Sequence, residues 1–377
     1  MSWLTPTAKI RTLSDCLAQG SDNFLLLRFI AASMVIYGHA PAISGGGGPK
    51  DLFIWLRWGT YSGSIAVDIF FIVSGFLITG SFVRRRNVVD FIWARILRIM
   101  PAYTVCVTLC ALVFGALLTQ LSLSIYLQEP GTTGYILKNV RLGLDLAWDL
   151  PGVFQNNPRM NTVNGSIWTL PAEVRMYAWV AIFGVAGMLF ARRCFNFTLG
   201  ALLLFGLNFP ENIPLVPHPA FVRFAALFAV GGFCSINRSW IPVHGGFLLA
   251  LIVLAYVFQP TGAYPYLFAL AETAFVFWFA YALKWYGFNR FGDYSYGIYL
   301  WGFPAQQWVA SLAGHLPDLV NALYGFLVAL ILAIGSWHLV EKPMLRLKGV
   351  PARMLRPVEA MYRKSRLAAF LGRRMNP

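Results

Sequence analysis

Charged residues are scarce in this chain of 377 residues: Asp, Glu, Lys and Arg together make up 12%, against about 25% in an average soluble domain. Acidic residues are the scarcest, with 15 Asp and Glu against 30 Lys and Arg. So little charge excludes a soluble globular protein, a disordered chain and a coiled coil. With 58% hydrophobic residues and a mean hydropathy of +0.61, the composition instead indicates a polytopic membrane protein.

Cysteine is also rare, with five residues in the whole chain. None forms a Cys-x-x-Cys pair or has the Cys/His spacing of a zinc site, so the sequence predicts neither a disulfide framework nor a metal centre. The glycine-rich stretch at residues 43–50, ISGGGGPK, lacks the Gly-Lys-Ser/Thr ending of a phosphate-binding loop. Residues 1–23 are polar and precede no cleavage pattern, so the first apolar segment is expected to remain as an anchor.

Long apolar runs are what the chain has instead. A helix needs about 20 mostly apolar residues to cross a bilayer, and ten runs approach that length. The sequence therefore predicts an all-α, polytopic membrane helix bundle of about ten transmembrane helices. The expected spans are residues 24–42, 64–83, 99–120, 167–190, 196–210, 219–236, 243–259, 266–284, 294–312 and 320–340.

The basic residues are distributed unevenly over the connections between these runs. If the N-terminus is cytoplasmic, 22 Lys and Arg fall in cytoplasmic segments and 5 in outer segments. Cytoplasmic segments carry such an excess, so both termini are predicted to lie inside, and the basic total needs no nucleic-acid partner. The expected organisation is a cytoplasmic segment 1–23, a transmembrane domain 24–340 and a basic cytoplasmic tail 341–377 along anionic membrane lipids.

Ionisable side chains within the predicted spans mark candidate functional sites, because placing a charge in lipid costs about 3 kcal/mol or more. Arg28 and His39 are eleven residues apart in the first span, which puts them on one helix face about 16 Å apart. Asp68 in the second span and Glu173 in the fourth are expected at the depth of His39. A carboxylate beside an imidazole raises its basicity, so these three residues suit a general base and its partners. A buried structural network is the alternative.

Two arginines lie at the cytoplasmic end of the third predicted span. Arg95 and Arg98 are three residues apart on one helix face, and Pro101 is expected to open the span. Guanidinium groups suit phosphate oxygens, so this pair is a candidate phosphate site. The alternative is a signal for membrane orientation alone, which is the interpretation we give to residues 84–86.

Six motifs occur in order along residues 20–345. They are the Arg28-x10-His39 pair, VDIFFIVSGFLI at 67–78, FxxxRxxRIxP from Phe91 to Pro101, SIWTLPAEVRMY at 166–177, YSYGIYLW at 294–301 and Glu341-Lys342-Pro343. Together they resemble the acyltransferase 3 family of integral membrane O-acyltransferases. One position departs from the family, which often has a histidine after YLW where this chain has Gly302.

The resemblance implies a multi-pass enzyme of the bacterial inner membrane. It would take an acyl group, acetyl in the simplest case, from acyl-CoA on the cytoplasmic side. The acceptor would be a hydroxyl of a cell-surface polysaccharide, lipopolysaccharide or glycolipid. Acyl-CoA would be a co-substrate, and no tightly bound cofactor is expected. The sequence favours no oligomeric state.

The resemblance also assigns roles to the candidate residues. Arg28, Arg95 and Arg98 would bind the phosphates of acyl-CoA at the inner face. His39 would deprotonate the acceptor hydroxyl or attack the thioester to form an acyl-imidazole, and Glu173 and Asp68 would orient it. The residues expected on the acceptor side, or as donors to the oxyanion, are Asn164, Ser166, Trp168, Tyr177 and Tyr299.

Two other functions fit the same residues. In a transporter of a glycan or small molecule, His39, Glu173 and Asp68 would form a proton relay. In a catalytically silent relative, the chain would bind acyl-CoA or glycan without turnover, and Gly302 favours this reading. Consumption of acyl-CoA, ion-coupled solute flux and binding without turnover distinguish the three.

Overall fold

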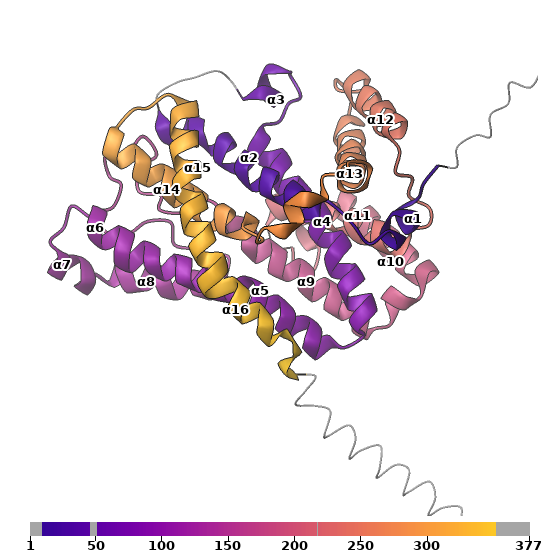
Figure 1. Ribbon diagram of the computed structural model, residues 1–377, viewed down its shortest axis with the longest axis horizontal. Helices are drawn as coiled ribbons and strands as arrows, with labels where there is room; N and C mark the ends of the chain where they lie inside the picture. The colour runs from indigo at the N-terminus through magenta and orange to yellow at the C-terminus, as the bar shows by residue number, and fades with distance from the viewer. Residues whose placement is uncertain (1–9, 46–50, 217, 352–377) are drawn as a thin grey trace, which may run out of the picture.

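The computed structural model of the protein is described for residues 10–45, 51–216 and 218–351, and it consists of helices joined by turns and irregular segments (Figure 1). Within these ranges the only β-structure is three isolated bridges. The predicted all-α fold is therefore confirmed. Residues 1–9 of the expected N-terminal segment, 46–50 of the glycine-rich stretch and 352–377 of the expected tail lie outside the described residues.

The first half of the described chain forms α1 to α8, and an irregular connection, residues 141–166, follows α8. A π-helical segment, Cys110–Gly115, joins α5 to α6 into one rod. The elements are α1 (Leu13–Ala18), α2 (Phe24–Ser44), α3 (Leu52–Trp55), α4 (Ser62–Arg85), α5 (Val88–Leu109), α6 (Ala116–Leu118), α7 (Leu123–Gln128) and α8 (Pro130–Val140).

The second half begins after a 3-10 turn, Ile167–Thr169, and ends in another, Arg346–Gly349. A second π-helical segment, Trp337–Glu341, joins α15 to α16. The elements are α9 (Leu170–Val185), α10 (Arg192–Asn208), α11 (Pro219–Ile236), α12 (Gly245–Val257), α13 (Tyr264–Ala282), α14 (Ser295–Ala313), α15 (Asp318–Ser336) and α16 (Lys342–Leu345). In Figure 1, α7 and α8 lie at the opposite side of the molecule from α12 and α13.

Six helical stretches in the described part of the chain are long and apolar enough to cross a membrane. They are Phe24–Ser44, Ser62–Arg85, Val88–Leu118, Pro219–Ile236, Tyr264–Ala282 and Asp318–Gly349. The other four expected spans correspond to α9, α10, α12 and α14. The first three have only 16, 17 and 13 residues, and α14 carries polar side chains. A total of about ten spans, and the cytoplasmic placement of both termini, stay predictions.

The third long helix differs from its expected span. Its 31 residues begin at Val88 instead of 99, because the Asn87 side chain caps the helix by accepting a hydrogen bond from the Asp90 N–H. Pro101 consequently lies inside α5 and does not open it. Residues 88–98 include charged side chains that lower the local hydropathy, so the predicted span began too late, at residue 99. Arg95 and Arg98 are thus residues of the helix itself.

Helix α4 lies at the centre of the packing, with α2 and α11 against it. A Cβ atom on Gly75 would be 2.0 Å from the carbonyl oxygen of Phe228, and one on Gly231 would be 2.2 Å from that of Ile72. Glycine at both positions lets the two helix backbones touch, as small residues do between membrane helices. Helix α14, with most of its side chains buried, packs in turn against α2 and α15.

The connection before α9 enters the bundle instead of staying at its end. It makes hydrogen bonds to two successive parts of α14. Asn157 Nδ2 donates to the Gln307 carbonyl at 2.9 Å, and the Tyr299 hydroxyl, two turns nearer the start of α14, donates to the Ser166 carbonyl at 2.7 Å. Asn164 is only 1% exposed. Residues 157–166, in the connection between the third and fourth predicted spans, thus lie against α14 inside the bundle. Irregular backbone is tolerated at such depth because protein groups satisfy it.

Candidate active site

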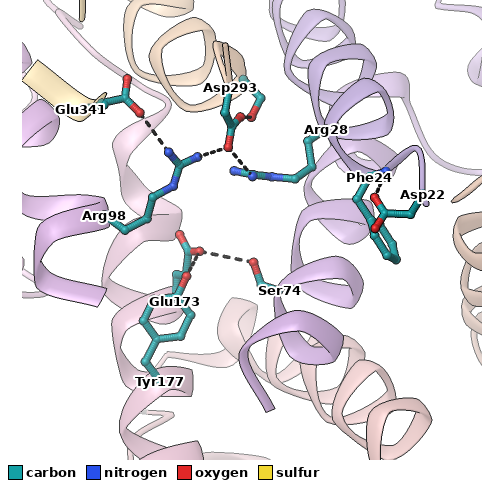
Figure 2. Close-up of polar contacts among 10 residues, drawn as sticks. Asp22, Phe24, Arg28, Ser74, Arg98, Glu173, Tyr177, Asp293 and Glu341 are labelled. Carbon is teal, nitrogen blue, oxygen red and sulfur yellow. Dashed lines mark hydrogen bonds and ion pairs between the residues drawn. The ribbon is translucent and has the colours of Figure 1, made fainter. Parts of the chain in front are cut away.

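Two arginines of the family motifs meet at one carboxylate. Arg28 Nη1 of α2 and Arg98 Nη2 of α5 lie 2.8 and 2.6 Å from the same atom, Oδ2 of Asp293. Arg98 Nη1 also contacts Glu341 Oε2 at 3.1 Å. Figure 2 shows the two guanidiniums approaching Asp293 from opposite sides. The beginnings of α2 and α14 and the end of α15 are thereby brought to one end of the bundle.

Two guanidinium groups and two carboxyl groups meet in this cluster. Burial alone would raise the pKa of Asp293, but the guanidiniums of Arg28 and Arg98 hold it well below the usual range. The Ser295 hydroxyl supports Asp293 by donating to its other oxygen at 2.6 Å. Asp293 therefore stays ionised, and it fixes the separation of the two arginines.

A cavity of about 50 Å³ opens beside this cluster. Its walls include Arg28, Ser74, Glu173, Tyr296 and Tyr299. Glu173 accepts a hydrogen bond from the Tyr177 hydroxyl and one from Ser74 Oγ at 3.4 Å, as Figure 2 shows.

Glu173 thus lies beside Arg28, and the expectation that it shares the depth of His39 is wrong. The prediction counted the depth of α9 from a membrane surface at Ser166. Ser166 is in fact buried against Tyr299, because the preceding connection has already entered the bundle.

Arg95 differs from the other two arginines. Its guanidinium carbon lies 5.9 Å from the centre of the Tyr177 ring and 6.0 Å from that of Phe91. Its Nε atom is buried and has no hydrogen-bond partner. Within the described ranges, it has no ion pair. Of the three predicted phosphate ligands, Arg95 alone makes no ion pair with a described residue, although Glu173 attracts it electrostatically.

His39 lies on α2 three turns beyond Arg28, as predicted for an uninterrupted helix. Its ring meets the ring of Phe303 edge to face, with 5.3 Å between centres, and Arg159 interacts with it electrostatically. Nδ1 is buried and unpartnered. The hydrogen bonds of Glu173 and Asp68 in the described structure go to other groups, so their predicted orientation of His39 stays a prediction.

Asp68 is fully buried and belongs to a different cluster. It pairs with Arg223 of α11, which also donates to Ser64 Oγ at 2.9 Å. Asp68 Oδ1 and Glu272 Oε1 are both buried without a hydrogen-bond partner in the described structure. The two carboxyl groups are close enough to interact electrostatically. Arg223 and Glu272 border an apolar cavity of about 810 Å³ between α9, α10, α11 and α13.

Three of the residues predicted for the acceptor side come together. Asn164 Nδ2 donates to the Leu300 carbonyl at 3.0 Å, and the Tyr299 hydroxyl bonds to both the Ser166 carbonyl and Thr169 Oγ1. The Oγ atom of Ser166 is buried without a partner.

The other two residues predicted for the acceptor side lie elsewhere. Trp168 packs on the rings of Phe221 and Phe224. Tyr177 bonds to Glu173. The predicted role of all five residues is untested by these contacts.

One face of α14 connects the cavity to His39. Tyr296 and Tyr299 line the cavity, and Phe303, on the same face, contacts His39. Seven residues of helix correspond to about 10 Å. Gly302 is turned toward α2, where a Cβ atom would lie 2.7 Å from Ile36 Cγ1. The departure from the family at this position therefore coincides with a close helix contact.

The sequence did not indicate Asp293 as a site residue, and it gave Glu341 no role beyond its motif. The one signal for Asp293 in the sequence is its place immediately before the motif YSYGIYLW. In the part of the chain that the structure describes, no three His, Cys, Asp or Glu side chains gather in a metal-binding arrangement.

A family model described as an acyltransferase domain matches residues 22–340. The chain belongs to the acyltransferase 3 family. The resemblance of its six motifs is thereby confirmed, and all residues of the clusters around Asp293 and His39 lie within or next to the matched range.

Individual relatives agree with this assignment. The chain is 29% identical over 344 residues to an O-acetyl transferase of Shigella phage Sf6, covering 86% of this chain and 96% of the relative. It is also 32% identical over 159 residues to nodulation protein 10 of Rhizobium leguminosarum bv. viciae, covering 41% and 42%. No solved structure matches. Family and relatives together support a membrane O-acyltransferase.

Proposed function

We propose that this protein transfers an acyl group, acetyl in the simplest case, from acyl-CoA to a hydroxyl of a cell-surface polysaccharide, lipopolysaccharide or glycolipid. It would act as a multi-pass protein of the bacterial inner membrane with both termini in the cytoplasm. The observation that carries this proposal is the convergence of motif arginines beside a cavity, at one end of a helix whose other end bears His39.

The arginine end suits the nucleotide part of acyl-CoA. Phosphate oxygens accept well from guanidinium groups, and a forked, fixed pair binds them with directional hydrogen bonds. Asp293 supplies that fixation for Arg28 and Arg98. Arg95 adds a guanidinium whose buried Nε has no hydrogen-bond partner and could donate to an anionic ligand. We place the donor phosphates here, at the predicted cytoplasmic end.

His39 suits the transfer step. Its Nδ1 is free of partners in a buried place, so a ring nitrogen is available to take a proton. The acceptor oxygen would bond to the thioester carbonyl carbon while the carbon–sulfur bond breaks. The hydroxyl proton would pass to His39 and then to the CoA thiolate. In the alternative route His39 first attacks the thioester carbonyl carbon, which forms an acyl-imidazole and releases CoA. The acceptor hydroxyl then attacks the acyl carbon and releases the imidazole.

The residues between the two ends suit the acyl arm and the oxyanion. Tyr296 and Tyr299 line the cavity below Phe303, so a pantetheine arm following this face of α14 would bring the thioester toward His39. Asn164, Ser166 and Tyr299 supply polar groups along this path. We propose that Glu173, which lines the cavity and accepts from Tyr177, shapes its wall, and that Asp68 joins α4 to α11 through Arg223.

The test is release of CoA from acetyl-CoA by membranes containing the full chain, with a cell-envelope extract as acceptor. We expect release by the wild type and by His244→Asn, which replaces an exposed histidine at the N-cap of α12 with another capping residue. His39→Ala should accumulate normally and release no CoA above background. Release by His39→Ala at the wild-type rate would overturn the assigned chemistry. No release with acetyl, succinyl or longer donors would overturn the transferase, and flux or binding assays would then separate transporter from silent relative.

A further inference from the structure

The cavity of about 810 Å³ between α9, α10, α11 and α13 has no part in the chemistry assigned above. Most of its lining side chains are apolar. They include Met176, Phe183, Leu199, Leu227, Phe228 and Phe268. Apolar cavities exclude water and bind apolar molecules. The composition of the walls therefore indicates a hydrocarbon as the occupant.

The length of the cavity matches one leaflet of a bilayer. Along α11 its lining runs from Val222 to Gly232, and ten residues of helix correspond to about 15 Å. The hydrocarbon core of a whole bilayer is about 30 Å thick. A lipid chain that belongs to one leaflet therefore fits the cavity in length as well as in polarity.

The cavity is bordered by side chains at the surface of the bundle. Leu203 of α10 and both Tyr266 and Leu270 of α13 line the cavity and are exposed. Exposed apolar side chains of this kind mark contacts with a membrane. A lipid chain can consequently enter the cavity sideways from the bilayer, between α10 and α13.

Polar side chains line the cavity where α11 and α13 begin. Arg223 is in the second turn of α11, Tyr264 opens α13, and Glu272 is about two turns further along α13. Arg223 pairs with Asp68 of α4, and the Tyr264 hydroxyl donates to the Trp58 carbonyl just before α4. The beginnings of α4, α11 and α13 are thereby held together, and the cavity has a polar end beside them.

This polar end offers both a hydrogen-bond acceptor and donors. Glu272 is only 7% exposed, and its Oε1 is buried without a partner. Arg223 donates to Ser64 and Asp68, which leaves other N–H groups of its five. A hydroxyl group can donate to Glu272 and accept from Arg223, whereas the oxygens of a phosphodiester only accept. The polar end therefore suits a sugar better than a lipid phosphate.

The polar end is also connected to the helix turn that carries His39. Thr60 lines the cavity, and the next residue, Tyr61, packs on α2. A Cβ atom on Gly38, the residue before His39, would lie 3.1 Å from Tyr61 Cδ2. One short segment thus contacts both the cavity and the surroundings of the proposed general base.

We propose that this cavity holds the hydrocarbon chain of a lipid-anchored glycan, and that this glycolipid is the acceptor. The inference rests on the proposed function and narrows its acceptor to a sugar with an anchor chain. The chain would lie among the apolar walls. The first sugar would meet Glu272 and Arg223, and the sugars beyond it would extend toward His39.

The experiment compares two acceptor fractions with the same sugars. One is the glycolipid fraction of a cell-envelope extract, and the other is that fraction after hydrolysis has removed its hydrocarbon chains. CoA release from acetyl-CoA is measured with the purified full chain in phosphatidylcholine bilayers. Ala226→Trp fills the cavity from α11, and Ala226→Leu does so more mildly. Ala250→Trp is the matched control, because Ala250 is an exposed alanine of α12 outside the cavity.

We expect the KM of the wild type and of Ala250→Trp to be about tenfold lower for the glycolipid than for the freed glycan. Ala226→Trp should raise the KM for the glycolipid about tenfold and leave that for the freed glycan unchanged, and Ala226→Leu should shift it less in the same direction.

Two results would overturn this inference and leave the transferase in place. One is a wild-type KM for the freed glycan equal to or below that for the glycolipid. The other is an equal effect of Ala226→Trp on both fractions, which would assign the cavity to a bilayer phospholipid. No CoA release by the wild type with either fraction would overturn the proposed function itself, and this inference with it.

Discussion

The side-chain amide of Asn164 donates to the backbone carbonyl of Leu300, 3.0 Å away, at a point where α14 cannot satisfy that carbonyl itself. In a regular helix the Leu300 carbonyl would accept from the N–H of residue 304, but that residue is proline and has none. The Cys106 thiol is a second donor to the same oxygen at 3.6 Å. The connection before α9 therefore supplies the donor that the Leu300 carbonyl of α14 lacks, next to Tyr299.

The first prediction concerns this contact. Asn164→Leu preserves approximate size but leaves the Leu300 carbonyl with only the weak Cys106 donor. An unsatisfied buried carbonyl costs about 1–3 kcal/mol, so thermal unfolding in detergent should occur at a lower temperature. Acyl transfer should fall as well, because the same segment positions Ser166 against Tyr299.

A second substitution tests whether the cost of Asn164→Leu comes from the Leu300 carbonyl. Pro304→Ala restores a helix N–H that can reach the Leu300 carbonyl. In that background Asn164→Leu should cost clearly less than in the wild-type background, which a double-mutant cycle measures. Equal costs in the two backgrounds would contradict the proposed exchange of donors.

The second prediction concerns Asp293, which holds Arg28 and Arg98 together. Asp293→Asn removes the charge that both guanidiniums share and leaves them to repel each other. Breaking a buried ion pair costs about 3–5 kcal/mol, and the partial exposure of this cluster lowers the expected cost to about 2–3 kcal/mol. Acetyl-CoA binding should weaken with it. Asp145→Asn, in an exposed connection, is the control and should change neither quantity.

The pH dependence of this effect has a definite sign. The pKa of Asp293 lies below its ordinary value of 3.8 in the folded protein, so the unfolded state binds the proton more readily. The stabilisation is fully present above about pH 5 and is lost as the pH falls through and below 4. The difference in unfolding temperature between wild type and Asp293→Asn should therefore shrink as the buffer is acidified through and below pH 4. A difference that grows on acidification would contradict this assignment.

The helical fold and part of the site could be predicted from the sequence. Apolar run length identifies the long helices, and a spacing of eleven residues puts Arg28 and His39 on one face whatever the surroundings. The motif context of Arg98 indicated a role at the same end of the bundle. These features are local, so the order of residues along the chain suffices for them.

What could not be predicted are the contacts between distant segments. Asp293 is 265 residues from Arg28. In the sequence, a single aspartate in a connection that also carries basic residues cannot be told from a solvent-exposed aspartate. Residues such as Asn157 and Asn164 resemble an exposed loop until their partner is known, because an amide is equally satisfied by water and by a helix carbonyl. The predicted depth of Glu173 was wrong for the same reason, because it was counted from a membrane surface at Ser166, which is buried in the structure.

The third prediction concerns Asp68 and Arg223. Arg223→Gln leaves a fully buried carboxylate without its cation, whereas Asp68→Asn leaves a half-exposed guanidinium that water can still reach; the side chain of Arg223 is 47% exposed. The arginine substitution should therefore destabilise more, by about 1–3 kcal/mol, and the asparagine substitution less than about 1 kcal/mol. Both unfolding temperatures are measured in the same detergent.

Activity decides the role of Asp68. If Asp68 only joins α4 to α11, Asp68→Asn should keep most of the acyl transfer, because an amide still accepts from Arg223 and can bond to Glu272. Loss of transfer in Asp68→Asn at unchanged stability would instead place this carboxyl in the chemistry with His39.

The fourth prediction concerns Gly302, the position at which the resemblance to the family implies a histidine. A Cβ atom there would lie 2.7 Å from Ile36 Cγ1, so Gly302→His should overpack the α2–α14 contact and destabilise the protein by about 1–3 kcal/mol. Ile36→Ala alone should also destabilise it, because it leaves a cavity. Ile36→Ala removes side-chain volume at the point where Gly302→His adds it. The double variant should therefore be more stable than the sum of the two single effects predicts. Strict additivity of the unfolding temperatures would show that the imidazole points elsewhere and that Ile36 is not what excludes it.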